Sequence, residues 1–366
     1  MKRGDWRSLD ESDVRARPNP RGSRPRTKRR PEHAGAVPAR VVRTDRGRYA
    51  VVLEPPAGGI PAGAGTITAM KARELGHTSI VVGDLVFLVG DVSGSQGTLA
   101  RIVRLAPRTS VLRRSADDAD PSERVIVADA DQLVVVTSVA DPPPRPRLID
   151  RCLVAAYDAG MDAVLCLTKS DLATVERADL EALYVPLGVT VVVTGLPDGA
   201  EDAELAGDLM GLGDVRDRMA GRVSVLVGHS GVGKSTLVNA LVPGAARATG
   251  DVNEVTGRGR HTSTNVIALP LPGGGWVIDT PGIRSFGLGH VRPERVLAAF
   301  ADLAAAAENC PRGCTHASDA PDCWLDEWAG VDANRWSRLD SIRRLWLSRA
   351  EGAGGAGPVA KGGSAR

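Results

Sequence analysis

One stretch of the chain has the residue types and the spacing that cradle phosphate groups. Residues 228–236 read GHSGVGKST and match the pattern G-x-x-x-x-G-K-[ST]. In such a loop the backbone N–H groups point at the phosphates, the lysine supplies a positive charge, and the next hydroxyl ligates Mg²⁺. An apolar strand pattern at 222–228 precedes the loop and a helical pattern follows it, as the motif requires. The phosphate-site residues that we predict are Gly228, His229, Ser230, Gly231, Val232, Gly233, Lys234, Ser235 and Thr236, with Ser235 also a magnesium ligand.

A second motif has the chemistry to read a guanine base. Residues 168–171, TKSD, follow an apolar run and match [NT]-K-x-D. The carboxylate of Asp171 can accept hydrogen bonds from the ring N–H and the exocyclic amine of guanine, a donor pair that adenine lacks. The stem of Lys169 can pack on the base, and Thr194 with Gly195 can support it through backbone groups. The base-site residues that we predict are Thr168, Lys169, Ser170, Asp171 and Thr194.

A third motif, DTPG at 279–282, follows the apolar run WVI and is typical of the second switch of a GTPase. Asp279 would hold Mg²⁺ through water, and the N–H of Gly282 would meet the γ-phosphate. The best understood hydrolytic GTPases place a water-orienting glutamine directly after this glycine. Ile283 stands there in this chain and cannot orient water, so another residue must do so.

The segment GRGRHTST at 257–264 lies where the first switch belongs, between the phosphate loop and DTPG. Ser263 or Thr264 can supply a further magnesium ligand, and the residues alone leave the choice open. His261 is the nearest side chain that could position the attacking water, and we predict it as the catalytic residue. The arginines of the same segment could instead contact phosphate or RNA.

Four residues near the C-terminus have the spacing of a metal site. Cys310, Cys314, His316 and Cys323 supply three thiolates and one imidazole within fourteen residues. Such a set suits a closed, tetrahedral and therefore structural Zn²⁺ site, one ion per chain. The prolines and glycine among them indicate a loop rather than a core element. The other two cysteines, at 152 and 166, lie in apolar segments and are expected in the core.

The composition limits the kinds of protein that this chain can be. It has 366 residues, 43% hydrophobic and 25% charged, with a net charge of +2. A chain of this length predicts two or three domains. We find no apolar run of the ~20 residues that span a bilayer and no secretory signal pattern, so we expect a cytoplasmic protein without a membrane partner. Five cysteines in a chain this long do not form a disulfide framework.

The elements that must position these motifs change character along the chain. Residues 40–112 contain about five short strands broken by turns, which favours an OB-type barrel. Apolar strands then alternate with helical patterns, which predicts a parallel α/β sheet, with 269–280 as an added hairpin. The domains that we predict are a disordered basic arm (1–38), an OB-fold domain (39–115), a GTPase domain (120–290), a mostly helical zinc-binding domain (291–350) and a flexible tail (351–366).

Two basic regions point to nucleic acid without proving it. Residues 15–30 carry eight basic side chains and no acidic one. Such an arm is either a solubilising tail or a phosphate-binding arm. Five arginines follow the barrel strands closely, which favours a polyanionic partner over an ordinary solvated face. They are Arg101, Arg104, Arg108, Arg113 and Arg114.

The motifs occur in the order TKSD, GHSGVGKST, GRGRHTST, DTPG and the Cys-His cluster, behind a small barrel. Ordinary GTPases place the guanine reader after the phosphate loop, and a circular permutation can preserve the site. Over roughly residues 40–350 the chain resembles the circularly permuted, small-subunit-dependent GTPases of the RsgA (YjeQ) family. The resemblance implies GTP and GDP as ligands, Mg²⁺ and Zn²⁺ as cofactors, and binding to the small ribosomal subunit and its rRNA late in maturation, with hydrolysis stimulated by the subunit. It also implies that the family's catalytic histidine corresponds to His261.

This sequence departs from the family pattern in two places. Ser263 stands where the family often has threonine. The Cys-His cluster has one residue fewer between its first two cysteines, and one residue more before its last cysteine, than the family pattern. Other functions remain open at this point: a phosphate-loop ATPase or kinase, which would not need TKSD, an RNA-binding scaffold without turnover, and a GTPase that modifies tRNA. We expect a monomer.

Overall fold

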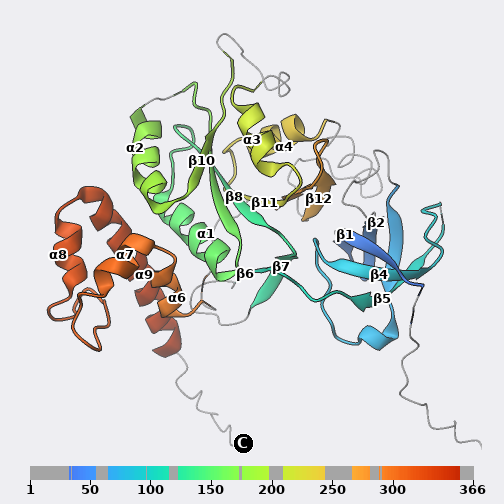
Figure 1. Cartoon of the computed structure of the whole chain (residues 1–366), viewed down its shortest axis with the longest axis horizontal. Helices are drawn as coiled ribbons and strands as arrows, with labels where there is room; N and C mark the ends of the chain where they lie inside the picture. Colours follow the sequence, from blue (N-terminus) through green and yellow to red (C-terminus); the bar gives the residue numbers. More distant parts are fainter. Residues whose placement is uncertain are drawn as a thin grey trace, which may run out of the picture. The chain divides into compact units, whose positions relative to one another are not determined.

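The structure is a computed structural model of the chain. It describes residues 33, 35–54, 65–95, 97–114, 123–172, 175–197, 209–243, 266–280, 288 and 291–354. The described elements lie in one compact unit, Gly35–Arg366, and Figure 1 shows their arrangement. The arm predicted at 1–38, the segment that contains His261, and residue Gly282 lie almost wholly outside the described residues.

Five short strands form a closed barrel at the N-terminal end of the described chain. They are β1 (Val37–Asp45), β2 (Arg48–Leu53), β3 (Ile67–Lys71), β4 (Leu85–Gly90) and β5 (Ala100–Leu105). Their order is β1-β2-β3-β5-β4, and β4 also pairs with β1, which closes the barrel. All these pairs are antiparallel except β3 with β5. The predicted OB-type barrel is confirmed.

Alternation of side chains fills the barrel interior. Strand β3 buries every second residue, because successive side chains of a strand point to opposite faces. The turn of the first hairpin falls at Arg46-Gly47, and both residues have positive φ, as type I′ turns require. The interior cluster consists of Ala39, Val41, Val51, Ile67, Ala69, Ile80, Val86, Leu88, Ala100 and Ile102.

A second, two-stranded sheet follows the barrel and was not anticipated from the sequence. Strands β6 (Val111–Arg114) and β7 (Arg124–Ala128) pair antiparallel. Arg113 forms an ion pair with Glu123 across this hairpin. One of the arginines expected to face a polyanion therefore has a partner within the chain.

The central sheet carries the nucleotide motifs. Its parallel strands are β8 (Gln132–Ser138), β9 (Asp162–Thr168), β10 (Thr190–Val193), β11 (Val223–Val227) and β13 (Trp276–Asp279). They lie in the order β10-β9-β8-β11-β13, each parallel to its neighbour. Strand β8 is buried along its whole length, as a strand covered on both faces must be. The predicted parallel α/β sheet is confirmed.

The expected hairpin at 269–280 is also present, slightly longer than predicted. Strand β12 (Ile267–Pro270) pairs antiparallel with β13. On its other side, Ile267 pairs with Arg43 of β1, so one ladder of strands runs from the parallel sheet into the barrel.

Within the described part of the chain, four helices cover this sheet, two on each face. They are α1 (Pro146–Asp158), α2 (Val175–Tyr184), α3 (Leu212–Met219) and α4 (Lys234–Leu241). Figure 1 shows α1 and α2 on one side of the strands and α3 and α4 on the other.

The alternating residues of β8 divide the core between these two faces. Leu133 and Val135 belong to the cluster that contains α1 residues, whereas Val134 and Val136 belong to the cluster built on α3 and α4. Because they are parallel, β8, β9, β11 and β13 have their C-terminal ends along one edge of the sheet. Ligands of open α/β sheets bind at such an edge.

The C-terminal region is helical, as predicted. It contains α6 (Pro293–Ala298), α7 (Ala301–Ala307), α8 (Trp324–Gly330) and α9 (Ala333–Gly354). The loop between α7 and α8 holds the Cys-His cluster. Among the described residues, none of the helices has the length and the apolar character needed to cross a bilayer.

Buried polar groups join α9 to the GTPase helices. Asp150 of α1 accepts a hydrogen bond from the hydroxyl of Tyr184 (3.0 Å) and interacts with Ser341 of α9. Arg338 of α9 forms an ion pair with Asp302 and donates to the backbone carbonyl of residue 183 (2.6 Å). Burial raises the pKa of Asp150 to about 6.

Candidate functional site

The predicted phosphate loop connects β11 to α4, at the C-terminal edge of the sheet. Gly231 and Gly233 have φ of 87° and 85°, a backbone conformation that glycine adopts without strain. Gly233 is the residue before the first turn of α4, so the free N–H groups of the helix start where phosphate would lie. His229 is buried beside the loop, with Nδ1 2.9 Å from the carbonyl oxygen of Ser230.

Lys234 lies beside the end of β13, because β13 runs parallel to β11 and Asp279 pairs with Leu226 in that ladder. The ammonium group of Lys234 forms an ion pair with Asp279 and donates to the backbone carbonyl of Thr280. Both charged side chains are buried, 8% and 7% exposed. The structure therefore brings the lysine of the phosphate motif and the aspartate of the second-switch motif into direct contact.

Thr168, the last residue of β9, joins the base-reading motif to the phosphate loop. Its buried hydroxyl lies 2.6 Å from the carbonyl oxygen of Val232 and 3.2 Å from that of Thr137. A hydroxyl has one proton, so it donates to one of the two, and the shorter contact is the one to the phosphate loop. Two segments far apart in the sequence are thus fixed against each other, in the way that a single nucleotide site requires.

Lys169 and Asp171 follow directly. Lys169 has a φ of 58°, which is uncommon for a residue with a side chain, and its ammonium group donates to the carbonyl of Asp141. Asp171 accepts a hydrogen bond from the backbone N–H of Leu196 (2.9 Å). That contact fixes one oxygen of the carboxylate predicted to read the base.

The expected backbone support from Thr194 and Gly195 takes a different form. The carbonyl of Thr194 accepts from the N–H of Ser170 (3.1 Å), and Gly195 forms a bridge with Met210. A Cβ at Gly195 would lie 2.5 Å from the Ser170 hydroxyl and 2.9 Å from the Asp171 carboxylate. The carbonyl of Thr194 therefore binds the motif itself, the peptide of Gly195 pairs with Met210, and a side chain at 195 would press on Ser170 and Asp171.

Three of these features escaped the sequence-based prediction. They are the N–H of Leu196, the closeness of Gly195 to Asp171, and the link from Thr168 to Val232. Each depends on strands that are distant in sequence. A glycine two residues beyond β10 was the one local signal that could have indicated a close approach.

Ser235 lies in the first turn of α4 and is exposed, and Asp279 ends β13 nearby. Hydroxyl and carboxylate oxygens are the donors that Mg²⁺ prefers, so these two residues fit that ion. The other predicted ligands, Ser263 or Thr264, lie outside the described residues, as do His261 and Gly282. The roles of those residues rest on the sequence alone.

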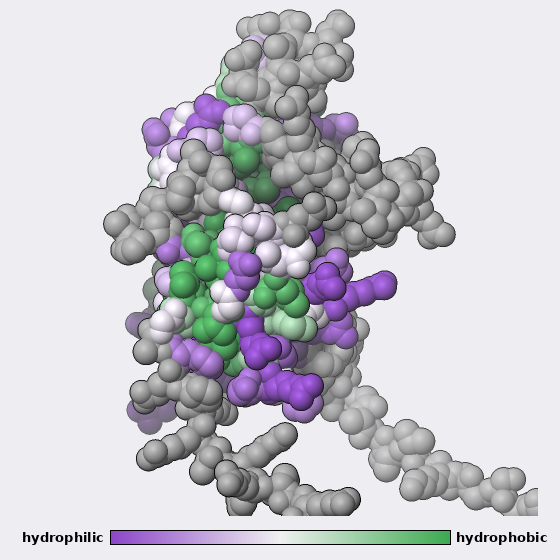
Figure 2. Space-filling view, turned by 90° about the vertical axis from the view of Figure 1, so that its right-hand side faces the viewer, coloured by the Kyte–Doolittle hydropathy of each residue, from purple (hydrophilic) through white to green (hydrophobic). Residues whose placement is uncertain are grey.

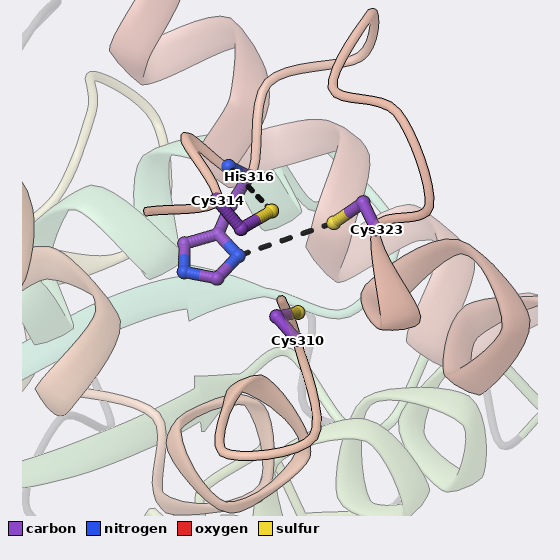
Figure 3. A group of neighbouring side chains, drawn as sticks. All are labelled: Cys310, Cys314, His316 and Cys323. Atoms are coloured by element: carbon purple, nitrogen blue, oxygen red, sulfur yellow. Dashed lines mark hydrogen bonds between the residues drawn. The ribbon is translucent and has the colours of Figure 1, made fainter. Parts of the chain in front are cut away.

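The four predicted metal ligands meet in the loop between α7 and α8. Figure 3 shows Cys310, Cys314, His316 and Cys323 converging on one point, and their ligand atoms all lie within 4.8 Å of one another. Three sulfur atoms and one ring nitrogen at such separations fit a tetrahedral zinc ion, with Zn–S bonds of about 2.3 Å. His316 adopts a positive φ of 56°, which turns its ring into the cluster.

Burial shifts the pKa values of Cys323 and His316 in opposite directions. Burial, with Cys310 and Cys314 close by, raises the pKa of the Cys323 thiol to about 11. Burial and the positive charge of Arg343 lower the pKa of His316, which favours the neutral ring that can ligate a metal ion. Thiols that crowd together without a cation resist ionisation, and a bound metal ion reverses this by stabilising the thiolates.

The arginines of the barrel only partly form the basic face that the sequence predicted. Arg108 forms an ion pair with the fully buried Asp84 (2.7 Å), so it serves the barrel itself. Arg104 lies over the ring of Phe87 (3.8 Å to the ring centre), and Arg101 is exposed. Figure 2 faces this side and shows hydrophobic residues next to strongly hydrophilic ones. Arg104 lies on the Phe87 ring because these two residues pair across β4 and β5.

The sequence matches known proteins along most of its length. The family model described as RsgA GTPase matches residues 105–289. A Vibrio vulnificus (strain YJ016) protein named small ribosomal subunit biogenesis GTPase RsgA 1 is 35% identical over 283 residues, 75% of this chain and 76% of that protein. A Pseudomonas aeruginosa (strain LESB58) protein named small ribosomal subunit biogenesis GTPase RsgA is 38% identical over 264 residues, 71% of this chain and 74% of that protein.

Two solved structures have the same fold. The crystal structure of YjeQ from Thermotoga maritima aligns with a TM-score of 0.63 and 24% identity, over 86% of this chain and 99% of that one. The structure of YloQ, described as a circularly permuted GTPase, aligns with a TM-score of 0.61 and 22% identity, over 88% and 98%. At these identities the similarity concerns the fold. The matched model covers half of the chain, and the relatives exceed 30% identity over more than two thirds of their length, so this chain belongs to the RsgA GTPase family, whose members hydrolyse GTP.

Proposed function

We propose that this protein binds the small ribosomal subunit and hydrolyses GTP during late maturation of that subunit, and that the subunit stimulates hydrolysis. The relatives named above are small ribosomal subunit biogenesis GTPases. The observation that carries the nucleotide part is the buried hydrogen-bond contact between Thr168 and Val232, which fixes the base-reading motif on the phosphate loop despite their permuted order.

Several residues would act on GTP. The backbone N–H groups of the phosphate loop would bind the α- and β-phosphates, and Lys234 would turn from Asp279 toward the β- and γ-phosphates. Asp171 would accept the guanine hydrogen bonds while the N–H of Leu196 donates to its Oδ1. Lys169, whose backbone has an uncommon positive φ, would pack the aliphatic part of its side chain against the base.

Further residues would bind Mg²⁺ and position the attacking water molecule. Ser235 and Asp279 would hold Mg²⁺, together with Ser263 or Thr264, and the ion would neutralise charge on the phosphate oxygens. Gly282 would donate its N–H to the γ-phosphate. Because Ile283 cannot orient water, His261 would position the attacking water molecule.

The Cys-His cluster would bind one structural zinc ion per chain. The support is the convergence of its four ligand atoms and the chemistry of the donors. The ion would hold the loop between α7 and α8 in place, because a structural zinc site contributes directly to folding.

The contact with the subunit would be made largely with rRNA. Arg101 and Arg104, with Phe87, offer positive charge and a stacking surface on the barrel. The arm 1–38 would add charge, in keeping with its eight basic residues at 15–30. We further propose that the chain acts as a monomer with the domain boundaries given above, so that one barrel, one GTPase domain and one zinc-binding domain serve one subunit.

Two measurements test the function: the rate of GTP hydrolysis and the relative affinities for GDP and ADP. GTP hydrolysis by the full chain is measured alone, with purified small subunits and with large subunits, and affinities for GDP and ADP are measured beside it. We expect stimulation by small subunits only and preference for GDP. Equal affinity for ADP would contradict the guanine site, equal stimulation by large subunits would contradict the partner, and no turnover under any condition would favour a binding scaffold.

A further inference from the structure

Arg343 of α9 contacts the Cys-His cluster, although it lies twenty residues beyond the last ligand in the sequence. Its side chain is buried, 7% exposed. Nη2 points at the sulfur of Cys323 (3.7 Å), within the range of an N–H···S hydrogen bond, and Nε donates to the backbone carbonyl of His316 (3.0 Å). One guanidinium group thus reaches two of the four candidate ligands.

The orientation of Arg343 is itself fixed. Asp326 of α8 accepts two hydrogen bonds from the guanidinium, one of 2.9 Å, in the forked geometry that arginine and carboxylate share. The ring of Trp346, one turn further along α9, lies 6.2 Å from the ring of His316. Residues three apart share one face of a helix, so α9 presents Arg343 and Trp346 together to the cluster.

The net charge of a zinc-bound cluster makes a hydrogen-bond donor beside it favourable. Three thiolates and one Zn²⁺ ion carry a net charge of −1, and a buried net charge is costly without a partner. Arg343 donates a hydrogen bond to a ligand sulfur and so stabilises its negative charge, while Asp326 balances the charge of the guanidinium. Other arginines of α9 are directed elsewhere: Arg338 pairs with Asp302, and Arg344 pairs with Asp340 on the exposed side of the helix.

We propose that Arg343 is a positioning residue of the metal centre, which donates a hydrogen bond to the Cys323 thiolate, so stabilising its negative charge, and holds the His316 loop in ligating position. This inference rests on the proposed zinc binding. It assigns to α9 a direct part in retaining the metal ion. Lysine could not do the same, because its single ammonium group lacks the fork that reaches Asp326, His316 and Cys323 at once.

The test uses the full chain loaded with Zn²⁺, or with Co²⁺ as a coloured substitute. Metal affinity is measured by competition with a chelator, and the sulfur-to-cobalt charge-transfer absorption is recorded. The variants are Arg343→Gln, Arg343→Lys and Asp326→Asn, with Arg344→Gln as the matched control on the same helix. We expect Arg343→Gln to weaken metal affinity by about 10- to 100-fold, the usual effect of losing a partner of a metal ligand.

The cobalt spectrum separates a direct contact from general loosening of the fold. Loss of a hydrogen bond to sulfur raises its electron density, so the charge-transfer band should move to lower energy in both Arg343 variants. Asp326→Asn should shift it less, and Arg344→Gln should leave it unchanged. If Arg343→Gln does not fold, Arg343→Lys decides the matter, since a wild-type spectrum there would overturn the proposal. Wild-type affinity in Arg343→Gln would also overturn it, whereas a wild-type protein that binds no zinc would defeat the proposed zinc site instead.

Discussion

The side chains of Lys234 and Asp279 form a buried ion pair that joins the phosphate loop to the end of β13. The same lysine also donates to the carbonyl of Thr280, whose hydroxyl in turn donates to the carbonyl of Leu226 (2.7 Å). The lysine proposed to bind phosphate is therefore also a structural residue of this fold. A nucleotide phosphate that binds Lys234 would compete with Asp279 for it.

Replacing Lys234 with Met should destabilise the nucleotide-free protein, because it leaves the carboxylate of Asp279 buried without its partner. Breaking a buried ion pair from one side costs about 3 kcal/mol or more. Urea unfolding without nucleotide measures this cost. The double variant Lys234→Met with Asp279→Asn should recover most of the loss, and a single variant as stable as the wild type would show that the pair contributes nothing.

Replacing Gly195 with Ala should weaken guanine recognition, because the new methyl group would press on Ser170 and on the carboxylate of Asp171. We expect the affinity for GDP to fall by about tenfold, as for the loss of one hydrogen bond to a charged group. Calorimetric titration with GDP measures it. Gly213→Ala is the matched control, since a Cβ there meets no atom within 4 Å. Equal GDP affinity in both variants would remove Gly195 from the base site.

Replacing Asp171 with Asn should shift preference from guanosine toward xanthosine nucleotides. The amide of asparagine can donate to the second oxygen of xanthine, whereas it cannot accept both guanine donors. Affinities for GDP and for xanthosine diphosphate are compared in the two proteins. Unchanged GDP affinity in the variant would mean that Asp171 does not read the base.

The stability of the protein should depend on pH through Asp150. Burial raises its pKa from 3.8 to about 6, so the folded state holds a proton that the unfolded chain has lost between those pH values. The stability from this group is present at low pH and is lost as pH rises toward 6. Replacement by Asn removes this dependence. The stability of Asp150→Asn relative to wild type should therefore rise by up to about 3 kcal/mol between pH 4 and pH 7. A constant difference across this range, measured by urea unfolding, would contradict the shift.

Replacing His261 with Ala should leave GTP affinity nearly intact and remove the stimulation of hydrolysis by small subunits. The reason is chemical: Ile283 cannot orient water, and His261 lies two or three residues from the proposed magnesium ligand. The loss in stimulated rate should be on the order of 10²-fold or more. Single-turnover hydrolysis with small subunits measures it, and a variant that responds fully would assign the water to another residue.

Local sequence patterns predicted the scaffold of the site well. The alternation of β3 and the continuous apolar run of β8 each follow from how many faces of the strand are covered, which composition reveals. The phosphate motif predicted its own strand and helix, because a glycine loop of that spacing needs both. The four cysteine and histidine ligands are close in sequence, so their convergence was predictable from spacing.

The contacts that tune the site were not predictable in the same way. Arg108 has the composition of a basic surface residue, yet it pairs with the buried Asp84, twenty-four residues away. The partner of Asp171 is a backbone N–H, which every residue except proline carries, so no side chain marks it. Strands β6 and β7 are short and carry charged residues, and pairing rather than hydrophobic alternation defines them.

The order of strands in the central sheet also bears on synthesis of the protein. Strand β8 lies between β9 and β11, but β11 is made only after β9 and β10. While the chain grows, the half with the base-reading motif leaves the ribosome first, with one edge of β8 uncovered. Strand β11 must later insert beside that edge, and β13 must follow before Asp279 can meet Lys234. The growing chain therefore completes the proposed nucleotide site only late, after most of its length has been translated.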